Sequence, residues 1–205
     1  MKKIRIITSG IVALQLIVAT PLAFAAVQQK TTSEPTQADR IAGYKKKLTT
    51  QPTATEQANL KAKCKASQAI TKTLATKVDT TITSRQKTYD DLYKSFTTIV
   101  QGMKDADKVT DQLINTESAL QTKVNSFKVS AQSYKTLLAD LNEIDCVADP
   151  VGFKATLEET RTARATVNKD MVAVRTYLET TVKQELKTAK DSLTSTSTNT
   201  KKEAQ

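Results

Sequence analysis

The two cysteines are the residues of this sequence with the greatest potential for chemistry. Cys64 lies between two lysines in the helical run NLKAKCKASQ, and Cys146 follows much later, in DCVADP. A cysteine in such a setting has three common roles: a nucleophile activated by nearby cations, a metal ligand, or one half of a disulfide. The rest of the composition and the elements that carry the cysteines decide between these roles.

Composition argues against an enzyme and against a metal site. Histidine, the usual general base near neutral pH and the commonest metal ligand, is absent from the sequence. Two cysteines without histidine do not complete a structural zinc site in one chain. The four glycines lie far apart, so neither a phosphate-binding loop nor a dinucleotide fingerprint is present. We therefore expect no enzymatic activity, no cofactor and no bound metal.

The first 25 residues have the pattern of a secretory signal peptide. A basic start, MKKIR, precedes a short apolar run and the Ala-x-Ala site formed by Ala23, Phe24 and Ala25. The apolar run is short and contains polar residues, which disfavours an uncleaved membrane anchor. We expect cleavage after Ala25 and an exported chain without a transmembrane span, located in the periplasm, in the medium or at the cell surface.

Beyond the signal peptide, composition divides the chain into three parts. Residues 26–52 are predicted to be a polar leader with a short basic amphipathic helix, which ends before Pro52 because proline disfavours a helical conformation in the residue before it. Residues 53–190 carry sustained helical periodicity and predict a helical bundle. Residues 191–205 are rich in threonine and serine and are predicted to be a disordered tail.

Three rows of residues at spacings of three and four predict three long helices in residues 53–190. Gly102 and Asp105 indicate the turn between the first two, and Asp149 with Pro150 begins the third. Short connections make neighbouring helices antiparallel. The predicted fold is all-α: a long antiparallel three-helix bundle, or a coiled-coil hairpin with a third helix alongside, with one inter-helix disulfide and no strands.

Hairpin geometry brings the two cysteines together. Paired residues of an antiparallel hairpin lie equally far from its turn, and the midpoint between Cys64 and Cys146 is residue 105, inside the predicted turn. The same rule, with the midpoint moved by half a residue, places Tyr89 opposite Leu120. An oxidising compartment favours a disulfide, and closing a loop of roughly 83 residues should contribute about 4 to 5 kcal/mol to stability. We therefore predict a Cys64–Cys146 disulfide rather than a reactive thiol.

Polar residues interrupt the predicted rows and leave two interpretations open. They indicate either a loosely packed middle of the bundle or a surface for a further helix. These residues are Thr71, Thr81, Arg85, Thr116, Thr160 and Arg164.

Positive charge is concentrated near the start of the predicted mature chain. The formal net charge is +10, or +7 without residues 1–25; residues 40–77 contain nine bases and one acid, whereas residues 78–205 contain 18 of each. Clustered lysines attract anionic surfaces and polymers in a salt-dependent way. A solvated helix surface is the alternative interpretation. The candidate residues for binding an anionic partner are Arg40, Lys45, Lys46, Lys47, Lys61, Lys63, Lys65, Lys72 and Lys77.

The expected partner is an anionic envelope surface or polymer, or a protein. Nucleic acid is less favoured, because the segment has one arginine and one aromatic residue, Arg40 and Tyr44, with which to read or stack on bases. The sequence thus indicates an exported, non-enzymatic helical bundle that acts as an envelope-associated structural or interaction protein. The alternative is a periplasmic holdase-type chaperone with basic helical arms.

One resemblance agrees with this interpretation. Lys63-Cys64, the long hairpin with tyrosine and leucine in its rows, Cys146 and the following DPVGFKATLEETR resemble small secreted helical proteins of candidate-phyla (Patescibacteria-type) bacteria. The resemblance covers roughly residues 60–187. It implies an exported helical bundle with one disulfide, and it carries no activity and no functional residues.

Overall fold

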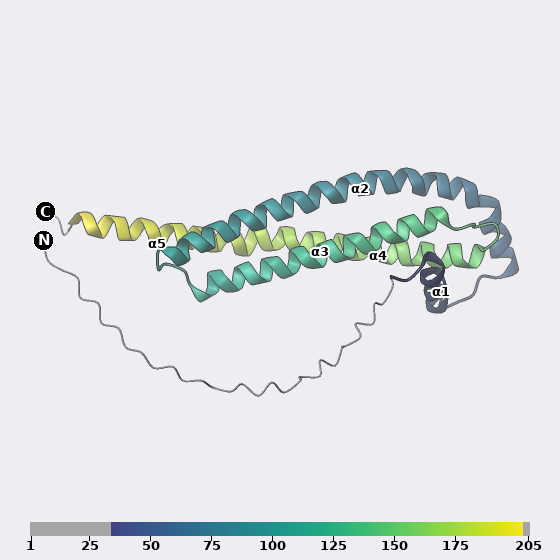
Figure 1. Ribbon diagram of the computed structural model, residues 1–205, viewed down its shortest axis with the longest axis horizontal. Helices are drawn as coiled ribbons and strands as arrows, with labels where there is room; N and C mark the ends of the chain where they lie inside the picture. Colours follow the sequence, from purple (N-terminus) through teal and green to yellow (C-terminus); the bar gives the residue numbers. More distant parts are fainter. Residues whose placement is uncertain (1–33, 203–205) are drawn as a thin grey trace, which may run out of the picture. The chain divides into compact units, whose positions relative to one another are not determined.

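The computed structural model describes residues 34–202, with side chains to residue 194, and this part of the chain is helical apart from its turns (Figure 1). The all-helical class is therefore confirmed for the described residues, which contain no strand. A bundle of three helices is not confirmed, because a short fourth helix joins the three long rods. The elements are α1 (Gln37–Lys47), α2 (Ala54–Asp105), α3 (Asp111–Glu143), and a last rod made of α4 (Pro150–Tyr177), the π-helical turn η1 (Leu178–Val182) and α5 (Lys183–Lys202).

The two ends of the chain bear on the predicted domain boundaries. The predicted signal peptide, residues 1–25, lies outside the described residues, and so do residues 203–205. From Pro35 onward the described chain forms one compact unit, so α1 packs with the long helices rather than standing apart as a leader. Helix α5 continues to Lys202, where a disordered tail was expected from residue 191. Neither glycine nor proline occurs there to end the helix.

Each of the four rods begins at a side-chain cap. The capping oxygen accepts a hydrogen bond from the backbone N–H three residues further on, which satisfies a donor that has no partner within the helix. At the first two caps the bond is reciprocal: hydrogen bonds from Thr36 and Thr53 lower the pKa of Asp39 and Glu56. The four caps are Thr36, Thr53, Thr110 and Asp149.

Helix α3 is the central element of the core. It packs against α2 on one side and α4 on the other, whereas α2 and α4 contact each other much less. Figure 1 shows α2 following an arc alongside the other two rods. The main core runs along these rods and includes Ile82, Phe96 and Val100 of α2, Leu120, Phe127 and Leu138 of α3, and Val174 of α4.

The register between α2 and α3 differs from the prediction. The connection between these helices occupies residues 106–110, later in the chain than the turn that the sequence indicated. The ring of Tyr89 consequently packs edge-on against Phe127, with ring centroids 5.1 Å apart. Phe127 lies about two helical turns beyond Leu120, the partner that the midpoint rule assigned to Tyr89.

The π-helical turn keeps the last rod aligned with the core. Val174 and Val182 are buried, while Leu178 and Leu186 are half-buried in the same cluster. These four residues follow one another at a constant spacing of four, which exceeds the 3.6 residues of a regular α-helical turn. The wider turn of η1, whose hydrogen bonds span five residues, accommodates this spacing.

Candidate functional site

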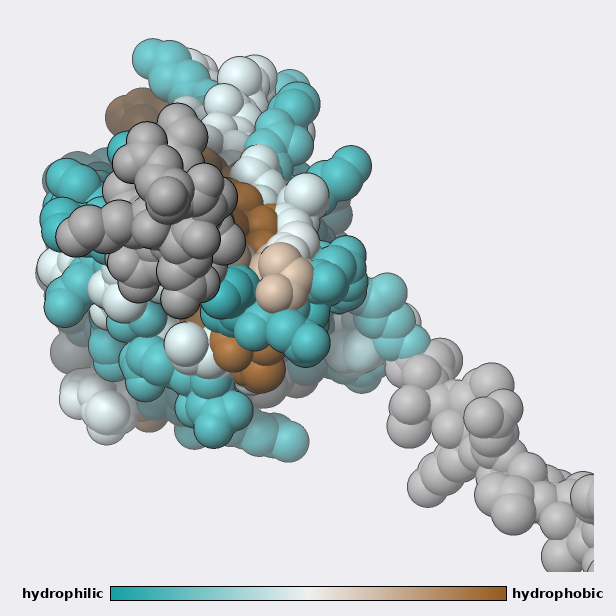
Figure 2. Space-filling model, turned by 90° about the vertical axis from the view of Figure 1, so that its left-hand side faces the viewer, coloured by the Kyte–Doolittle hydropathy of each residue, from teal (hydrophilic) through white to brown (hydrophobic). Residues whose placement is uncertain are grey.

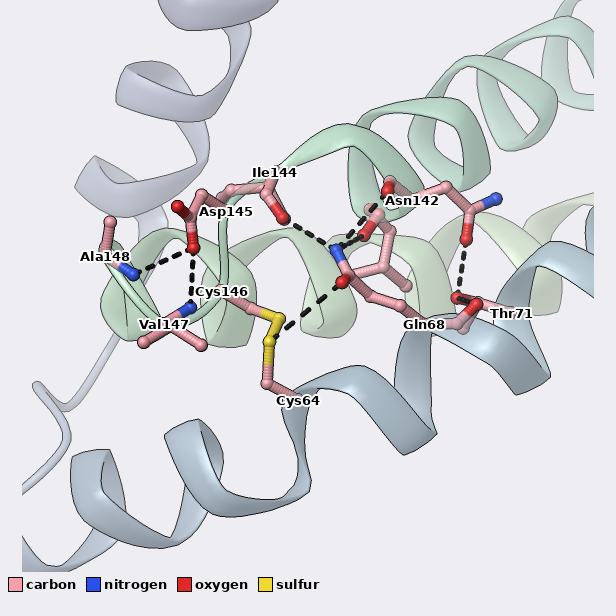
Figure 3. Close-up of a disulfide and its surroundings, with 10 residues drawn as sticks. Cys64, Gln68, Thr71, Asn142, Ile144, Asp145, Cys146, Val147 and Ala148 are labelled. Carbon is pink, nitrogen blue, oxygen red and sulfur yellow. Dashed lines mark hydrogen bonds between the residues drawn. A yellow bond between two sulfur atoms is a disulfide. The ribbon is translucent and has the colours of Figure 1, made fainter.

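The predicted disulfide is confirmed. Cys64 of α2 is joined to Cys146, which lies in the connection between α3 and α4, and their Cα atoms are 5.7 Å apart. Both residues are buried, and no free cysteine remains. Figure 3 shows the bond beside the last turn of α3. The cysteines therefore join two rods and offer no thiol for catalysis.

The side chains around the disulfide complete the end of α3 (Figure 3). A helix leaves its last carbonyl oxygens without partners. The Gln68 amide of α2 donates to the carbonyl of Ile144 at 2.7 Å, and the Thr71 hydroxyl donates to the side-chain oxygen of Asn142 at 2.6 Å. The Asp145 carboxylate accepts two backbone N–H groups of the following turn, both at 3.0 Å. These contacts hold the end of α3 and the turn after it against α2.

A buried carboxylate near the end of α3 holds α1 in place. The Arg40 guanidinium of α1 donates to both oxygens of Asp140 on α3, from Nε at 2.9 Å and from Nη2 at 2.5 Å. The Tyr44 hydroxyl donates to the same carboxylate at 3.1 Å, and the Asp140 side chain is only 1% exposed. Burial and the charge of Asp140 raise the pKa of Tyr44 to about 12. We call these three residues the Asp140 cluster.

Two lysines of α1 are also paired with acids of α4 or its cap. The Lys45 ammonium lies 2.5 Å from a carboxylate oxygen of Asp149, and the Lys47 ammonium lies 2.8 Å from Glu159. Each pair is partly exposed and contributes little alone. Together with Arg40, these lysines fasten α1 to the bundle. Three of the nine candidate residues for binding an anion are therefore already neutralised by carboxylates of this chain.

The other six candidate residues are exposed, and none forms an ion pair with a carboxylate in the described part of the chain: Lys46, Lys61, Lys63, Lys65, Lys72 and Lys77. Helical spacing places Lys61, Lys65 and Lys72 on one face of α2, and Lys63 and Lys77 on another. The structure thus divides the predicted patch into two rows, one on each side of the inward-facing residues of α2.

A groove lies between α2, α3 and α4 in the middle of the bundle, with a volume of about 350 Å³. Phe127 and Tyr134 of α3 form its floor, and Arg85 of α2 and Arg164 of α4 are among the residues of its walls. We call it the central groove. Arg85 and Arg164 are two of the polar residues that interrupt the predicted helical rows. Of the two interpretations of these interruptions, the groove therefore supports loose packing in the middle of the bundle. Sequence reasoning did not identify Tyr134 as a functional residue.

A second hollow lies at the other end of the bundle, near the connection between α2 and α3. It measures about 510 Å³ and lies between α2 and α5. Ile99 and Leu193, which line it, are 43% and 46% exposed. Figure 2 faces this end and shows hydrophobic residues between the hydrophilic ones that cover most of it. We call this feature the far-end hollow.

The remaining kinds of site find no support in the described residues. No group of acidic or cysteine side chains among them is suited to hold a metal ion. No helix in residues 34–202 combines the length and hydrophobicity that crossing a membrane requires. Comparison of the chain with protein-family models, with curated proteins and with solved structures gives no match in any of the three.

Proposed function

We propose that the protein is an exported, non-enzymatic helical bundle that binds an anionic envelope surface or partner through its exposed lysines. Export is supported by the signal-peptide pattern of residues 1–25 and is compatible with a buried disulfide, a bond that persists in oxidising compartments. The protein would act as a structural or interaction component of the envelope.

The contrast between paired and unpaired lysines carries this proposal. Lys45 and Lys47 pair with acids of the bundle, whereas the lysines of α2 in the candidate segment have no carboxylate partner among the described side chains. A lysine close to an anionic membrane contributes about 1 kcal/mol to binding, and salt screens this attraction. Two rows along α2 would let the bundle lie lengthwise on such a surface.

The test uses co-sedimentation with vesicles of phosphatidylcholine that contain phosphatidylglycerol. A variant with Lys46, Lys61, Lys63, Lys65 and Lys72 replaced by glutamate is expected to lose binding to these vesicles at low salt. Lys45 and Lys47 are left unchanged, because reversing their charge would also break the ion pairs of α1. Wild-type binding should weaken steeply as salt is added.

A matched control variant carries the same change in net charge elsewhere. Lys94, Lys108, Lys169, Lys183 and Lys190 are exposed and form no ion pair in the described part of the chain. Their replacement by glutamate should leave most of the binding intact. Equal losses in both variants would mean that only net charge matters, and unchanged binding in the first variant would refute the proposal.

The far-end hollow favours a second candidate function, the holdase-type chaperone. Exposed Ile99 and Leu193 offer an apolar surface to unfolded clients. A holdase should suppress the aggregation of a denatured outer-membrane protein, and Ile99→Ser with Leu193→Ser should weaken that effect. Absence of suppression by the wild-type protein would exclude this candidate and leave the proposal above unaffected.

A further inference from the structure

The floor of the central groove contains a tyrosine whose hydroxyl has no hydrogen-bond partner among the described residues. Tyr134 is only 5% exposed and lines the groove. Its hydroxyl makes no hydrogen bond with any residue in the described part of the chain. The buried hydroxyls without a partner in the described part of the chain are those of Thr97 and Thr116, so the Tyr134 hydroxyl opens into the groove rather than into the core. A hydroxyl in this position is therefore ready to donate to an acceptor that enters the groove.

The charges around the groove all have the same sign. Lys77, Arg85 and Arg164 line it, and no acidic residue does. None of the three forms an ion pair with a carboxylate among the described side chains. Some other cations of the long helices pair with an acid of a neighbouring helix, as Lys128 does with Asp90. Facing cations from α2 and α4 repel each other, and an anion between them would remove the repulsion.

Most of the remaining lining of the groove is apolar, with Thr81 and Asn168 as the polar exceptions. Val78 of α2, and Val167 and Met171 of α4, line it and are only half-buried. A volume of about 350 Å³ lies at the lower end of the range for small-molecule sites. The groove thus combines an apolar wall for a short hydrocarbon chain with hydrogen-bond donors and positive charge for an anionic head.

We propose that the central groove binds a single-chain anionic amphiphile. Its hydrocarbon chain would cover Val78, Val167 and Met171, and its head would accept hydrogen bonds from the Tyr134 hydroxyl and the Arg164 guanidinium. A carboxylate or a phosphate head satisfies the same donors. Such a ligand joins α2 to α4, the two long helices that contact each other least.

The protonation state of the donors suits this role. Burial raises the pKa of Tyr134, while the positive charge of Arg164 acts in the opposite direction. The hydroxyl therefore stays protonated at neutral pH and can donate. Arginine keeps its charge throughout the accessible pH range and presents donors in a planar fork that matches a carboxylate or a phosphate.

The size of the groove favours an amphiphile over an acidic amphipathic helix of a partner protein. A helix in a groove is held by side chains on several successive turns, whereas the central groove offers one tyrosine hydroxyl and a single pocket. The inference can be tested apart from the proposed envelope binding, because its variants change Arg164 and Tyr134, and Lys77, which lines the groove, is not among the five lysines changed in the vesicle test. Either idea can fail without the other.

The test is calorimetric titration of the disulfide-bonded chain with sodium laurate below its micelle concentration. We expect saturable binding with one site. Arg164→Gln should weaken it about tenfold or more, the loss of one charge-assisted hydrogen bond. Tyr134→Phe keeps the ring and should weaken it roughly three- to tenfold. Arg164→Lys should retain part of the affinity, and Arg175→Gln, an exposed change on the same helix, should leave it unchanged.

Titration with further ligands shows which kind of molecule supplies the anionic head. It also defines the results that would overturn the proposal. Preference for laurate supports a free fatty acid, and preference for lauroyl lysophosphatidylglycerol supports a lipid. Equal binding of dodecanol or dodecyltrimethylammonium would overturn the proposal, as would unchanged affinity in both Arg164→Gln and Tyr134→Phe. Binding of an acidic amphipathic peptide without binding of laurate would also overturn it. Circular dichroism melts verify that each variant remains folded.

Discussion

The Asp140 cluster and the central groove contain the same two kinds of donor, but only the cluster contains a carboxylate that accepts from them. Each combines an arginine with a tyrosine: Arg40 with Tyr44 at one end of the bundle, Arg164 with Tyr134 in its middle. At the end, the Asp140 carboxylate accepts hydrogen bonds from both donors. In the middle, no acidic residue lines the groove.

The charged groups of the Asp140 cluster therefore stabilise the fold, whereas those of the central groove are available to bind a ligand. A buried arginine–carboxylate pair fastens one helix to another, and it is costly to break because each charge then lacks its partner. The same donors without a carboxylate do not fasten anything within the chain. They leave α2 and α4 less closely packed and create a place for an external anion. The predictions below test whether the two regions behave this differently.

The largest expected effect concerns the disulfide beside the Asp140 cluster. Cys64→Ser with Cys146→Ser should lower the free energy of unfolding by about 4 to 5 kcal/mol, because the reduced chain gains the entropy of an open loop. Urea denaturation followed by circular dichroism measures this change. Adding a reductant should destabilise the wild type and leave the double variant as it is. A reductant effect of the same size in both would contradict the prediction.

The next prediction compares the two arginines directly. Arg40→Met should cost about 3 kcal/mol of stability, because the buried Asp140 charge then loses its main partner. Arg164→Met should change stability by less than about 1 kcal/mol, since this residue has no carboxylate partner among the described residues and an apolar side chain would suit the groove. Chemical denaturation of both variants gives the two values. Equal costs would show that the regions do not differ as described.

Two glycines provide a smaller and local comparison. A Cβ atom on Gly152 would lie 2.8 Å from Cγ of Asp149 and 2.9 Å from Cδ1 of Ile144, whereas one on Gly43 would meet nothing within 4 Å. Gly152→Ala should therefore cost about 1 to 3 kcal/mol through overpacking. Gly43→Ala, within α1, should stabilise the protein by about 0.5 to 1 kcal/mol. Thermal melts of both variants would show shifts in opposite directions, and shifts of the same sign would count against this packing.

The smallest effect concerns the pH dependence of the Asp140 cluster. The pKa of Tyr44 rises from its ordinary value of 10 to about 12 in the folded chain, so its contribution is complete below pH 10 and is lost as the pH rises from 10 to 12. Tyr44→Phe should cost about 1 kcal/mol at pH 7. The gap in stability between wild type and variant should then close above pH 10. A gap that stays constant up to pH 12 would contradict the assignment.

Local signals in the sequence were sufficient to predict the helices within residues 53–190, and hairpin geometry added the disulfide. Thr53 and Glu56 form the capping box that their spacing predicts, and Asp149 caps α4 with Pro150 as its first residue. The two cysteines meet because an antiparallel hairpin with its turn between them leaves few other arrangements. The same rule failed for Tyr89, since a connection centred a few residues later shifts every pair along α3.

Charge pairing could not be predicted, because it depends on how helices distant in the sequence face each other. Arg40 and Lys47 carry the same sequence signal as Lys61, yet the first two meet acids of α3 and α4 and the third does not. Asp140, the buried partner of Arg40, lies one hundred positions away in the chain and has no local feature that distinguishes it. The constant spacing of four before and after Val182 was a usable signal for the π-helical turn.

The sequence by itself therefore determined the helices within residues 53–190, the caps of α2 and α4 and which cysteines can pair, because these properties depend on neighbouring residues and on the length of chain between turns. Only the tertiary structure decided which cations are neutralised and where the core is incomplete. Those outcomes depend on the rotation and spacing of the two other long rods around α3. At Arg40 that arrangement supplies a carboxylate, and at Arg164 it leaves a groove.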